Sequence, residues 1–329
     1  MIKKTFPFAK FLVVLFIFIS FLFLGRIANL DLNSIARILG LTTTNQSVKI
    51  IFGGDLMFDR YIRQKAQKHG NDYIFGDMKD ILVESDLVVV NLEGSVTTFP
   101  SISIYSEFGS SENYVFTFDP NLVETLKVHN IRLVNIGNNH ISNFGLNGLN
   151  QTKNYLGQEN IKYFGDTGHQ DDQKFIIDEI KGLKIAFVNY NQFVKNGKPT
   201  TLENIVLLRE QVDFVVVYAH WGTEYMTQAN ASIQKTAREF IDQGADLIVG
   251  SHPHVVQQSE VYKGKTIYYS LGNFIFDQYF SNQTMKGLLL EVNINQRDFK
   301  ATYQEISIVL QPNGQTQVGR VREFVRNFF

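Results

Sequence analysis

The chain has 329 residues, 44% hydrophobic and 13% aromatic, which is enough to bury a substantial core in one large domain or two ordinary ones. Its 31 basic residues nearly balance 32 acidic residues, which excludes the electrostatic footprint of a nucleic-acid-binding protein. The absence of cysteine excludes disulfides, thiolate metal sites and cysteine nucleophiles. Imidazole and oxygen ligands remain, and these suit hard or borderline divalent metals.

The N-terminal segment is apolar and follows Lys3 and Lys4. Residues 6–24 approach the roughly 20 residues that a spanning helix needs, and the preceding positive charges favour a cytoplasmic N-terminus. We therefore predict a single-pass signal anchor over residues 1–28 that holds the rest of the chain at the cell membrane, on its extracytoplasmic side.

Two alternatives to an uncleaved anchor remain open. One is a cleaved signal peptide, although residues 25–28 make a poor cleavage site. The other is a cytosolic enzyme whose apolar N-terminus packs into the core. After the anchor we expect a tether over residues 29–47 and one domain over residues 48–329.

The domain reads as apolar strands alternating with helices, a pattern that predicts an α/β fold with a largely buried sheet. Strands are expected at residues 48–52, 87–92, 133–136, 184–188, 214–219, 247–249, 266–269, 288–294 and 302–309. Helices are expected at residues 61–68, 75–83, 121–129, 145–159 and 233–243. The polar and aromatic residues 98–117 indicate a long surface loop that shapes access to a site.

Polar side chains recur just after the carboxyl ends of the predicted strands, where open α/β sheets place their ligands. The set comprises Asp55, Glu93, Asn139, His140, His220, His252 and His254. In an extended backbone side chains alternate, so His252 and His254 are expected to face one cavity. These residue types at these positions predict a metal site.

The set has enough ligands for two divalent ions of Mn, Zn or Fe, bridged by Asp55. Glu93, Asn139, His220, His252 and His254 would complete the two shells, and a metal pair about 4 Å apart suits an in-line displacement. His140 would protonate a leaving alkoxide. Two other interpretations stay open: His140 as a structural hydrogen-bonding residue behind the ligands, and Glu93 as a capping carboxylate.

Six motifs occur in order along the chain: Gly54-Asp55-Leu56-Met57, Asn91-Leu92-Glu93, Asn138-Asn139-His140, His220-Trp221-Gly222-Thr223-Glu224-Tyr225, Gly250-Ser251-His252-Pro253-His254 and Tyr269-Ser270-Leu271-Gly272-Asn273-Phe274. The sequence resembles the CapA family of capsule synthesis proteins, which is associated with poly-γ-glutamate capsules and is similar in fold to calcineurin-like metallophosphoesterases. The resemblance implies an α/β/β/α sandwich. It also implies a dinuclear-metal, phosphoesterase-type hydrolase in the synthesis or export of capsule, poly-γ-glutamate or another envelope polymer.

The same resemblance places Asp55 at the first-motif aspartate and Glu93 at the bridging acid of the second motif. Two residues depart from the phosphoesterase pattern. Met57 stands where that pattern has a histidine, which leaves one metal site weak because a thioether is a poor ligand for a hard ion. Asn143 stands where an acid is common, which removes a charge behind His140. Both departures favour an alternative function, a non-catalytic, metal-stabilised component of a polymer export complex.

The implied substrate is an anionic polymer or a phosphoester, and the implied partners are other membrane proteins of capsule synthesis and export. Arg60, Glu224 and Asn273 are candidates for substrate contacts or for outer contacts to the ligands. Alternatively, Arg60 pairs with Asp59, Glu224 is an exposed carboxylate and Asn273 is a turn residue. The remaining histidines, His69, His129 and His169, are expected on the surface or on helix faces.

Overall fold

The computed structural model describes residues 47–169 and 172–322, a mixed α/β fold whose compact unit begins at Ser47. The predicted anchor over residues 1–28 and nearly all of the predicted tether lie outside the described residues. In the part of the chain that is described, no helix combines the length and the apolar character that crossing a bilayer requires.

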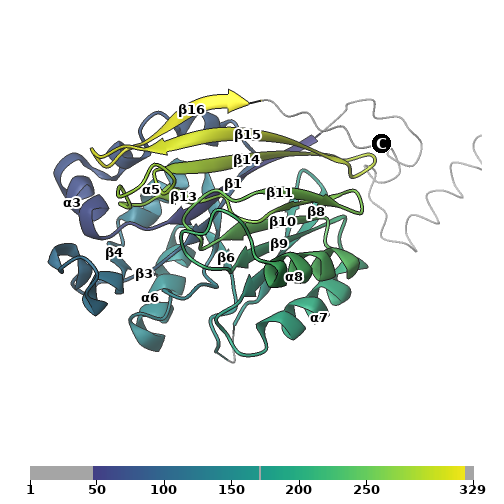
Figure 1. The fold of residues 1–329 in the computed structure, drawn as a ribbon, viewed down its shortest axis with the longest axis horizontal. Coiled ribbons are helices and arrows are strands. Elements are labelled where there is room, and N and C mark those ends of the chain that lie inside the picture. The colour runs from purple at the N-terminus through teal and green to yellow at the C-terminus, as the bar shows by residue number, and fades with distance from the viewer. Residues whose placement is uncertain (1–46, 170–171, 323–329) are drawn as a thin grey trace, which may run out of the picture. The chain divides into compact units, whose positions relative to one another are not determined.

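The first sheet has eight strands, and Figure 1 shows β16, β15, β14 and β1 side by side in it. Its order is β16 (Thr316–Arg322), β15 (Ala301–Leu310), β14 (Lys286–Asn295), β1 (Ser47–Leu56), β2 (Leu87–Leu92), β5 (Ile131–Asn135) and β6 (Lys162–Phe164), and β13 (Asn273–Ile275) pairs with β1 off this path. Strands β1, β2, β5 and β6 are parallel, so their carboxyl ends meet at one edge. Strand β14 runs antiparallel to β1.

The second sheet has six strands and a parallel centre. Its order is β11 (Ser259–Tyr262), β12 (Lys265–Tyr268), β10 (Leu247–Ser251), β9 (Phe214–His220), β8 (Leu183–Asn191) and β7 (Phe175–Ile180). The edge strands β7 and β11 are antiparallel to their neighbours. A separate short pair joins β3 (Ser95–Val96) to β4 (Thr117–Phe118).

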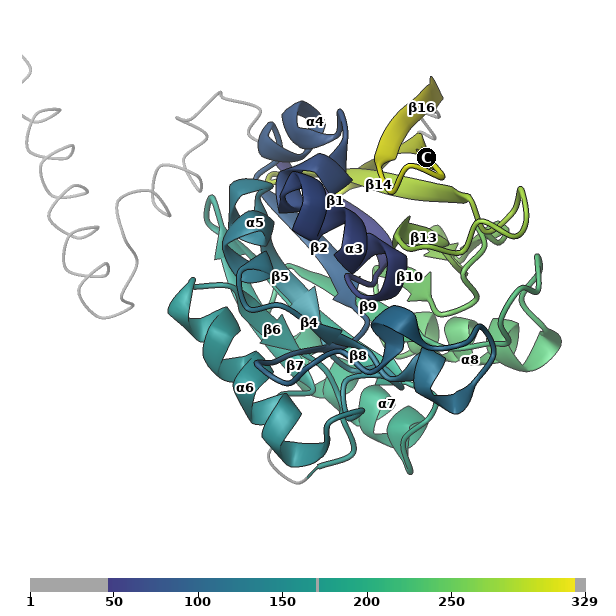
Figure 2. The same cartoon turned by 90° about the vertical axis from the view of Figure 1, so that its left-hand side faces the viewer.

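Helices cover the outer faces of both sheets. Figure 2 shows the first group over the first sheet, namely α3 (Arg60–His69), α4 (Lys79–Val83), α5 (Leu122–Val128) and α6 (Gly145–Gln158). The second sheet is covered by α7 (Gly197–Arg209) and α8 (Ala231–Asp242). Short 3₁₀ turns lie at η1 (Asn71–Phe75), η2 (Ser103–Tyr105) and η3 (Ser111–Tyr114).

Three buried clusters show the order of the layers. Along β1, Ile51 packs toward the helices, whereas Ile50 and Phe52 pack toward the second sheet, as the alternation of side chains requires. In the layer between the sheets the Phe52 ring lies 6.3 Å from that of Phe187 on β8. The expected order of helix, sheet, sheet and helix is therefore present.

Each of the nine expected strands overlaps an observed strand, but two helical segments differ from expectation. The helix expected over residues 75–83 is split, because Gly76 has a φ of 56° and separates η1 from α4. Helix α7 was not expected, and its outer face carries Val206 and Leu207, which are more than half exposed. Apolar residues on that face obscure the helical periodicity on which the prediction depends.

Candidate metal centre

The candidate ligands come together where the carboxyl ends of the parallel strands of both sheets meet. Asp55 is the penultimate residue of β1, Glu93 follows β2, and His220 ends β9. His252 and His254 follow β10, which pairs with β9. Strand direction within each sheet, together with the packing of the two sheets, thus brings residues nearly 200 positions apart into one site, as the strand-end pattern predicted.

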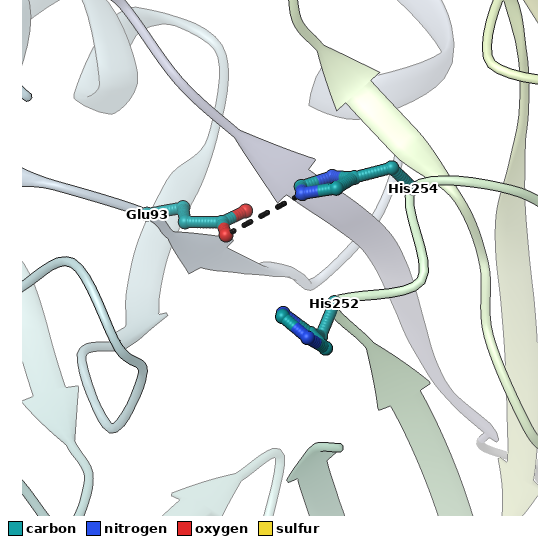
Figure 3. A group of neighbouring side chains, drawn as sticks. All are labelled: Glu93, His252 and His254. Carbon is teal, nitrogen blue, oxygen red and sulfur yellow. Dashed lines mark ion pairs between the residues drawn. The ribbon is translucent and has the colours of Figure 1, made fainter. Parts of the chain in front are cut away.

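The carboxylate of Glu93 is the centre of this site (Figure 3). Glu93 is fully buried, and neither of its oxygens has a hydrogen-bond partner within the described residues. Its Oε1 atom lies 3.8 Å from Nε2 of His220, 3.8 Å from Nε2 of His254 and 3.9 Å from Nε2 of His140. Burial, reinforced by the charge of Asp55, raises the pKa of Glu93 well above its usual value. A buried carboxylate without partners is costly unless a cation compensates it.

His252 and His254 reach the site in a different way from the one expected. They do not extend the strand, since β10 ends at Ser251 and the two residues have φ values of 94° and 57°. The backbone turns here, and the N–H of His252 donates to Oδ2 of Asp55 at 3.0 Å. Both rings still face Glu93, with centroids 6.0 Å apart, so the two histidines share one site, although the extended geometry expected for them is wrong.

Asp55 has fewer free acceptor positions than Glu93. Its Oδ1 accepts from Nδ2 of Asn91 at 2.8 Å, and its Oδ2 lies 3.4 Å from Nδ1 of His254. Burial by itself would raise the pKa of Asp55, but the contacts with His254 and Asn91 lower it overall. At neutral pH Asp55 is therefore ionised.

Two sets of possible ligand atoms share Glu93. One set is Glu93, His252 and His254, and the other is Asp55, Glu93 and His220, with the atoms of each set lying within 4.8 Å of one another. Glu93 is common to both sets, as the family resemblance implied for the bridging acid of the second motif, and the bridging position expected for Asp55 from residue chemistry stays a prediction.

His220 and Asn139 face each other across the second set. Nε2 of His220 lies 2.7 Å from Oδ1 of Asn139, while its Nδ1 accepts a hydrogen bond from Nδ2 of Asn91 at 3.2 Å. Burial lowers the pKa of His220 well below its usual value, and burial likewise lowers the pKa of His252 to about 3. Neutral imidazole is the form that binds metal ions.

His140 presents one nitrogen to the site and hydrogen-bonds with the other. Its Nδ1–H donates to the carbonyl of Tyr114 at 3.1 Å and to Oδ1 of Asn143 at 3.2 Å, so Nε2 faces Glu93. Burial lowers the pKa of His140 to about 4. Asn143 therefore keeps the hydrogen bond that an acid at this position would make, although it does not supply the charge.

A relay of buried asparagines was missed in the sequence and orients two of the ligands. Nδ2 of Asn189 donates to Oδ1 of Asn135 at 2.8 Å, and Nδ2 of Asn135 donates to Oδ1 of Asn91 at 2.9 Å. Asn91 then donates to both Asp55 and His220. The available signal was a Val-Asn pair within three apolar strands, at Asn91, Asn135 and Asn189.

Arg60 and Asp59 lie near the site but do not form an ion pair with each other. The guanidinium of Arg60 pairs with Asp277, donates to Oδ1 of Asn113 at 3.1 Å and lies over the Phe116 ring. Asp59 caps α3 and pairs with Arg63 at 2.9 Å. The alternative in which Arg60 pairs with Asp59 is therefore wrong.

The two other outer candidates take different positions. Asn273 orients a ligand, because its Oδ1 accepts from Nδ1–H of His254 at 2.9 Å and so leaves Nε2 turned toward Glu93. Glu224 is partly buried, and its charge contributes to the raised pKa of Glu93. The described hydrogen bonds place no ligand histidine in contact with Glu224.

The sequence also made predictions about Met57, His129 and His69, and the structure places each of them. Met57 is fully buried in the core beneath the helices, and its sulfur accepts a hydrogen bond from the N–H of Asp59 at 3.0 Å. His129, expected on the surface or a helix face, is instead buried and stacks on Phe75 at 3.9 Å between ring centroids. His69 is exposed as expected.

The sequence is similar to proteins of a known family. The family model described as "Bacterial capsule synthesis protein PGA_cap" matches residues 49–278. The capsule biosynthesis protein CapA of Bacillus anthracis is 29% identical over 253 residues, which are 71% of this chain and 61% of that protein. The PGA biosynthesis protein CapA of Bacillus subtilis (strain 168) is 32% identical over 253 residues, covering 72% of this chain and 65% of that protein.

The match thus spans less than two thirds of the length of each of these relatives. Among solved structures, the sulfate thiohydrolase SoxB of Thermus thermophilus aligns with a TM-score of 0.43 at 12% identity, over 75% of this chain and 45% of that one.

Proposed function

Because this chain belongs to the bacterial capsule synthesis protein family PGA_cap, we propose that it is a metal-dependent phosphoester hydrolase that acts in the synthesis or export of a capsule or a related envelope polymer. The names of the two Bacillus relatives, which refer to capsule and PGA biosynthesis, support the pathway. The observation that carries the chemistry is the buried, unpartnered carboxylate of Glu93 among the Nε2 atoms of three histidines.

The residues present fit two divalent ions. His252 and His254 would hold one ion and Asp55, His220 and Asn139 the other, with Glu93 common to both. A bound metal pair supplies Lewis-acid stabilisation of charge on phosphoryl oxygens and lowers the pKa of water.

The chain's own groups prepare this site. Asn273 keeps the His254 proton on Nδ1 and so leaves Nε2 free to bind an ion, and Asn91 holds the Asp55 carboxylate in place. His140 holds its proton on Nδ1 and presents Nε2, the atom that would receive a proton and pass it to a leaving oxygen.

Location in the envelope is part of the proposal. The apolar segment at residues 6–24 would anchor the chain at the cell membrane with the hydrolase domain outside, next to membrane proteins that make or export the polymer. Protease added to intact cells should digest the domain. Protection of the domain until the cells are lysed would contradict this location.

The direct test combines metal content with turnover. Protein comprising residues 47–329 should retain divalent metal after gel filtration and hydrolyse aryl phosphate mono- or diesters in a chelator-sensitive way. Glu93→Gln should lose both properties, whereas His69→Ala, which changes an exposed histidine, should lose neither. Metal content that is equal in Glu93→Gln and wild type would contradict the proposal.

One observation favours a second candidate function, a metal-stabilised component without catalytic activity. The sulfur of Met57 is occupied by a hydrogen bond from Asp59 and lies in an apolar core, so position 57 contributes no ligand of the kind a hard ion prefers. Protein that is loaded with metal but inert toward both classes of aryl ester would support this assembly or anchoring function.

A further inference from the structure

A row of exposed aromatic rings leads outward from the candidate metal centre. The Tyr225 ring lies 6.2 Å from that of His254, the Phe280 ring lies 5.3 Å from Tyr225, and the Phe108 ring lies 6.5 Å from Phe280. The exposed fractions are 40% for Tyr225, 55% for Phe280 and 78% for Phe108. We call these three residues the aromatic row. Large exposed rings that adjoin a polar site indicate a binding surface.

Tyr225, the inner end of the row, is held in place by the site itself. The N–H of Tyr225 donates to the carbonyl of Pro253, between the two ligand histidines, at 2.8 Å. The hydroxyl of Tyr225 accepts from Nε2 of Gln278 at 3.2 Å, and Gln278 in turn accepts from Asn273, which orients His254. A molecule whose reacting group sits at Glu93 would therefore extend onto the row.

The charge of the surrounding segments restricts what can lie there. Residues 98–117, 222–230 and 276–285 carry the row, and together they contain Glu107, Glu112, Glu224 and Asp277 but no lysine, arginine or histidine. The nearby Arg60 is buried and pairs with the partly buried Asp277, so these two residues add no net charge. The negative charge along the row therefore comes from Glu107, Glu112 and Glu224. An anionic chain such as polyglutamate would be repelled along this surface.

The rest of these segments is rich in serine, threonine, asparagine and glutamine. Aromatic faces cover the C–H surfaces of a sugar ring, while carboxylates and amides hydrogen-bond its hydroxyl groups. We propose that the aromatic row binds a neutral saccharide unit of the substrate, next to the bond that is cleaved. This proposal rests on the proposed hydrolase function for the position of the scissile group, but it makes a separate prediction about binding.

The test measures binding and needs no turnover. Metal-loaded protein would be titrated calorimetrically with neutral hexamers of glucose and of N-acetylglucosamine at millimolar concentration, and with poly-γ-glutamate and phosphatidylglycerol vesicles as competing ligands. We expect saturable binding of at least one neutral hexamer. Phe108→Ala and Phe280→Ala should each weaken it about fivefold, as expected for the loss of one ring contact. Phe299→Ala is the matched control, because Phe299 is an exposed phenylalanine in the β14–β15 turn at the opposite ends of the strands.

The outcomes separate this proposal from the hydrolase. Failure of both hexamers to bind, or binding that Phe108→Ala and Phe280→Ala leave unchanged, would overturn the saccharide site even if aryl phosphates are hydrolysed. Binding of poly-γ-glutamate or of vesicles that depends on the same two phenylalanines would also overturn it. Hexamer binding that depends on the row in protein without turnover would sustain the saccharide site and contradict the hydrolase.

Discussion

Oε1 of Glu93 lies 3.8 Å from Nε2 of His254, and neither oxygen of this buried carboxylate finds a hydrogen-bond donor in residues 47–169 or 172–322. Among the other candidate ligands, Asp55 is paired with Asn91, His254 with Asn273 and His220 with Asn139, whereas Nδ1 of His252 is, like Glu93, buried without a hydrogen-bond partner in the described residues. The unpaired atoms of Glu93 and His252 indicate where a cation is needed.

Glu93→Gln should stabilise the metal-free protein and destabilise the metal-loaded protein. Because the pKa of folded Glu93 is raised, the metal-free protein loses stability as the pH rises from the usual pKa of glutamate toward the folded pKa, and the cost is complete above the folded pKa. In excess chelator at mildly alkaline pH, Glu93→Gln should therefore raise the free energy of unfolding by about 1 kcal/mol or more. With saturating Mn²⁺ the variant should be less stable than wild type. Chemical denaturation in the two conditions checks this, and a destabilised variant in chelator would contradict it.

Asn91→Ala should weaken metal binding without removing a proposed ligand. The amide donates to both Asp55 and His220, so its loss frees both side chains to rotate. Loss of such an orienting partner typically costs about 10- to 100-fold in metal affinity. Calorimetric titration of Mn²⁺ into chelator-treated protein measures the change, with the exposed Asn147→Ala as the control. Equal affinities for Asn91→Ala and wild type would show that Asn91 does not orient the candidate ligands for metal binding.

Two glycine substitutions should have opposite effects on stability. A Cβ at Gly54 would lie 1.8 Å from the carbonyl oxygen of Gly272, where the N–H of the neighbouring Asp55 donates at 3.1 Å. Gly54→Ala should therefore cost about 1–3 kcal/mol of stability and displace Asp55.

The matched control is Gly157→Ala in α6, where an added Cβ would meet no atom within 4 Å. This substitution should stabilise the protein by about 0.5–1 kcal/mol, because alanine favours a helix more than glycine does. Urea unfolding curves of the two variants distinguish the effects, and equal midpoints would contradict the close approach at Gly54.

His129 should make stability depend on pH. Burial lowers its pKa below the usual 6.5, so the folded protein favours the neutral ring that stacks on Phe75. The unfolded chain then takes up a proton first as the pH falls. The stability that neutral His129 contributes is therefore complete above pH 6.5 and declines below it, toward the folded pKa.

His129→Gln removes this titration. The difference in unfolding free energy between wild type and His129→Gln should shrink as the pH falls below the usual pKa of histidine. A difference that stays flat for His129→Gln across this pH range would show that its ring is not held neutral.

The order of elements and the clustering of most candidate ligands could be predicted because runs of β-branched residues identify buried strands, and because parallel strands bring their carboxyl ends together. The local backbone conformation at the site could not be predicted. The turn at His252 and His254 depends on Asp55, which accepts the N–H of His252 from a strand of the other sheet. Alternation along a strand contains no information about such a long-range contact.

Residue chemistry at the strand ends could not distinguish Asp55 from Glu93, although the family resemblance placed Glu93 at a bridging acid, and it did not reveal the asparagine relay. Asp55 and Glu93 are both acids at strand ends, and the structure distinguishes them because Asn91 and the His252 N–H occupy the oxygens of Asp55. Pairing of Asn189 with Asn135 joins a strand of one sheet to a strand of the other. Which faces of two packed sheets meet is a property of tertiary packing, so only the Val-Asn pairs were visible beforehand.

The most direct test of the metal centre is anomalous diffraction from crystals of residues 47–329 grown with Mn²⁺ or Zn²⁺, with data collected on both sides of the metal absorption edge. We predict two anomalous peaks, both about 2.0–2.2 Å from oxygens of Glu93, one beside His252 and His254 and the other beside Asp55 and His220. Crystals with full metal in the solvent and no anomalous peak at Glu93 would contradict the account.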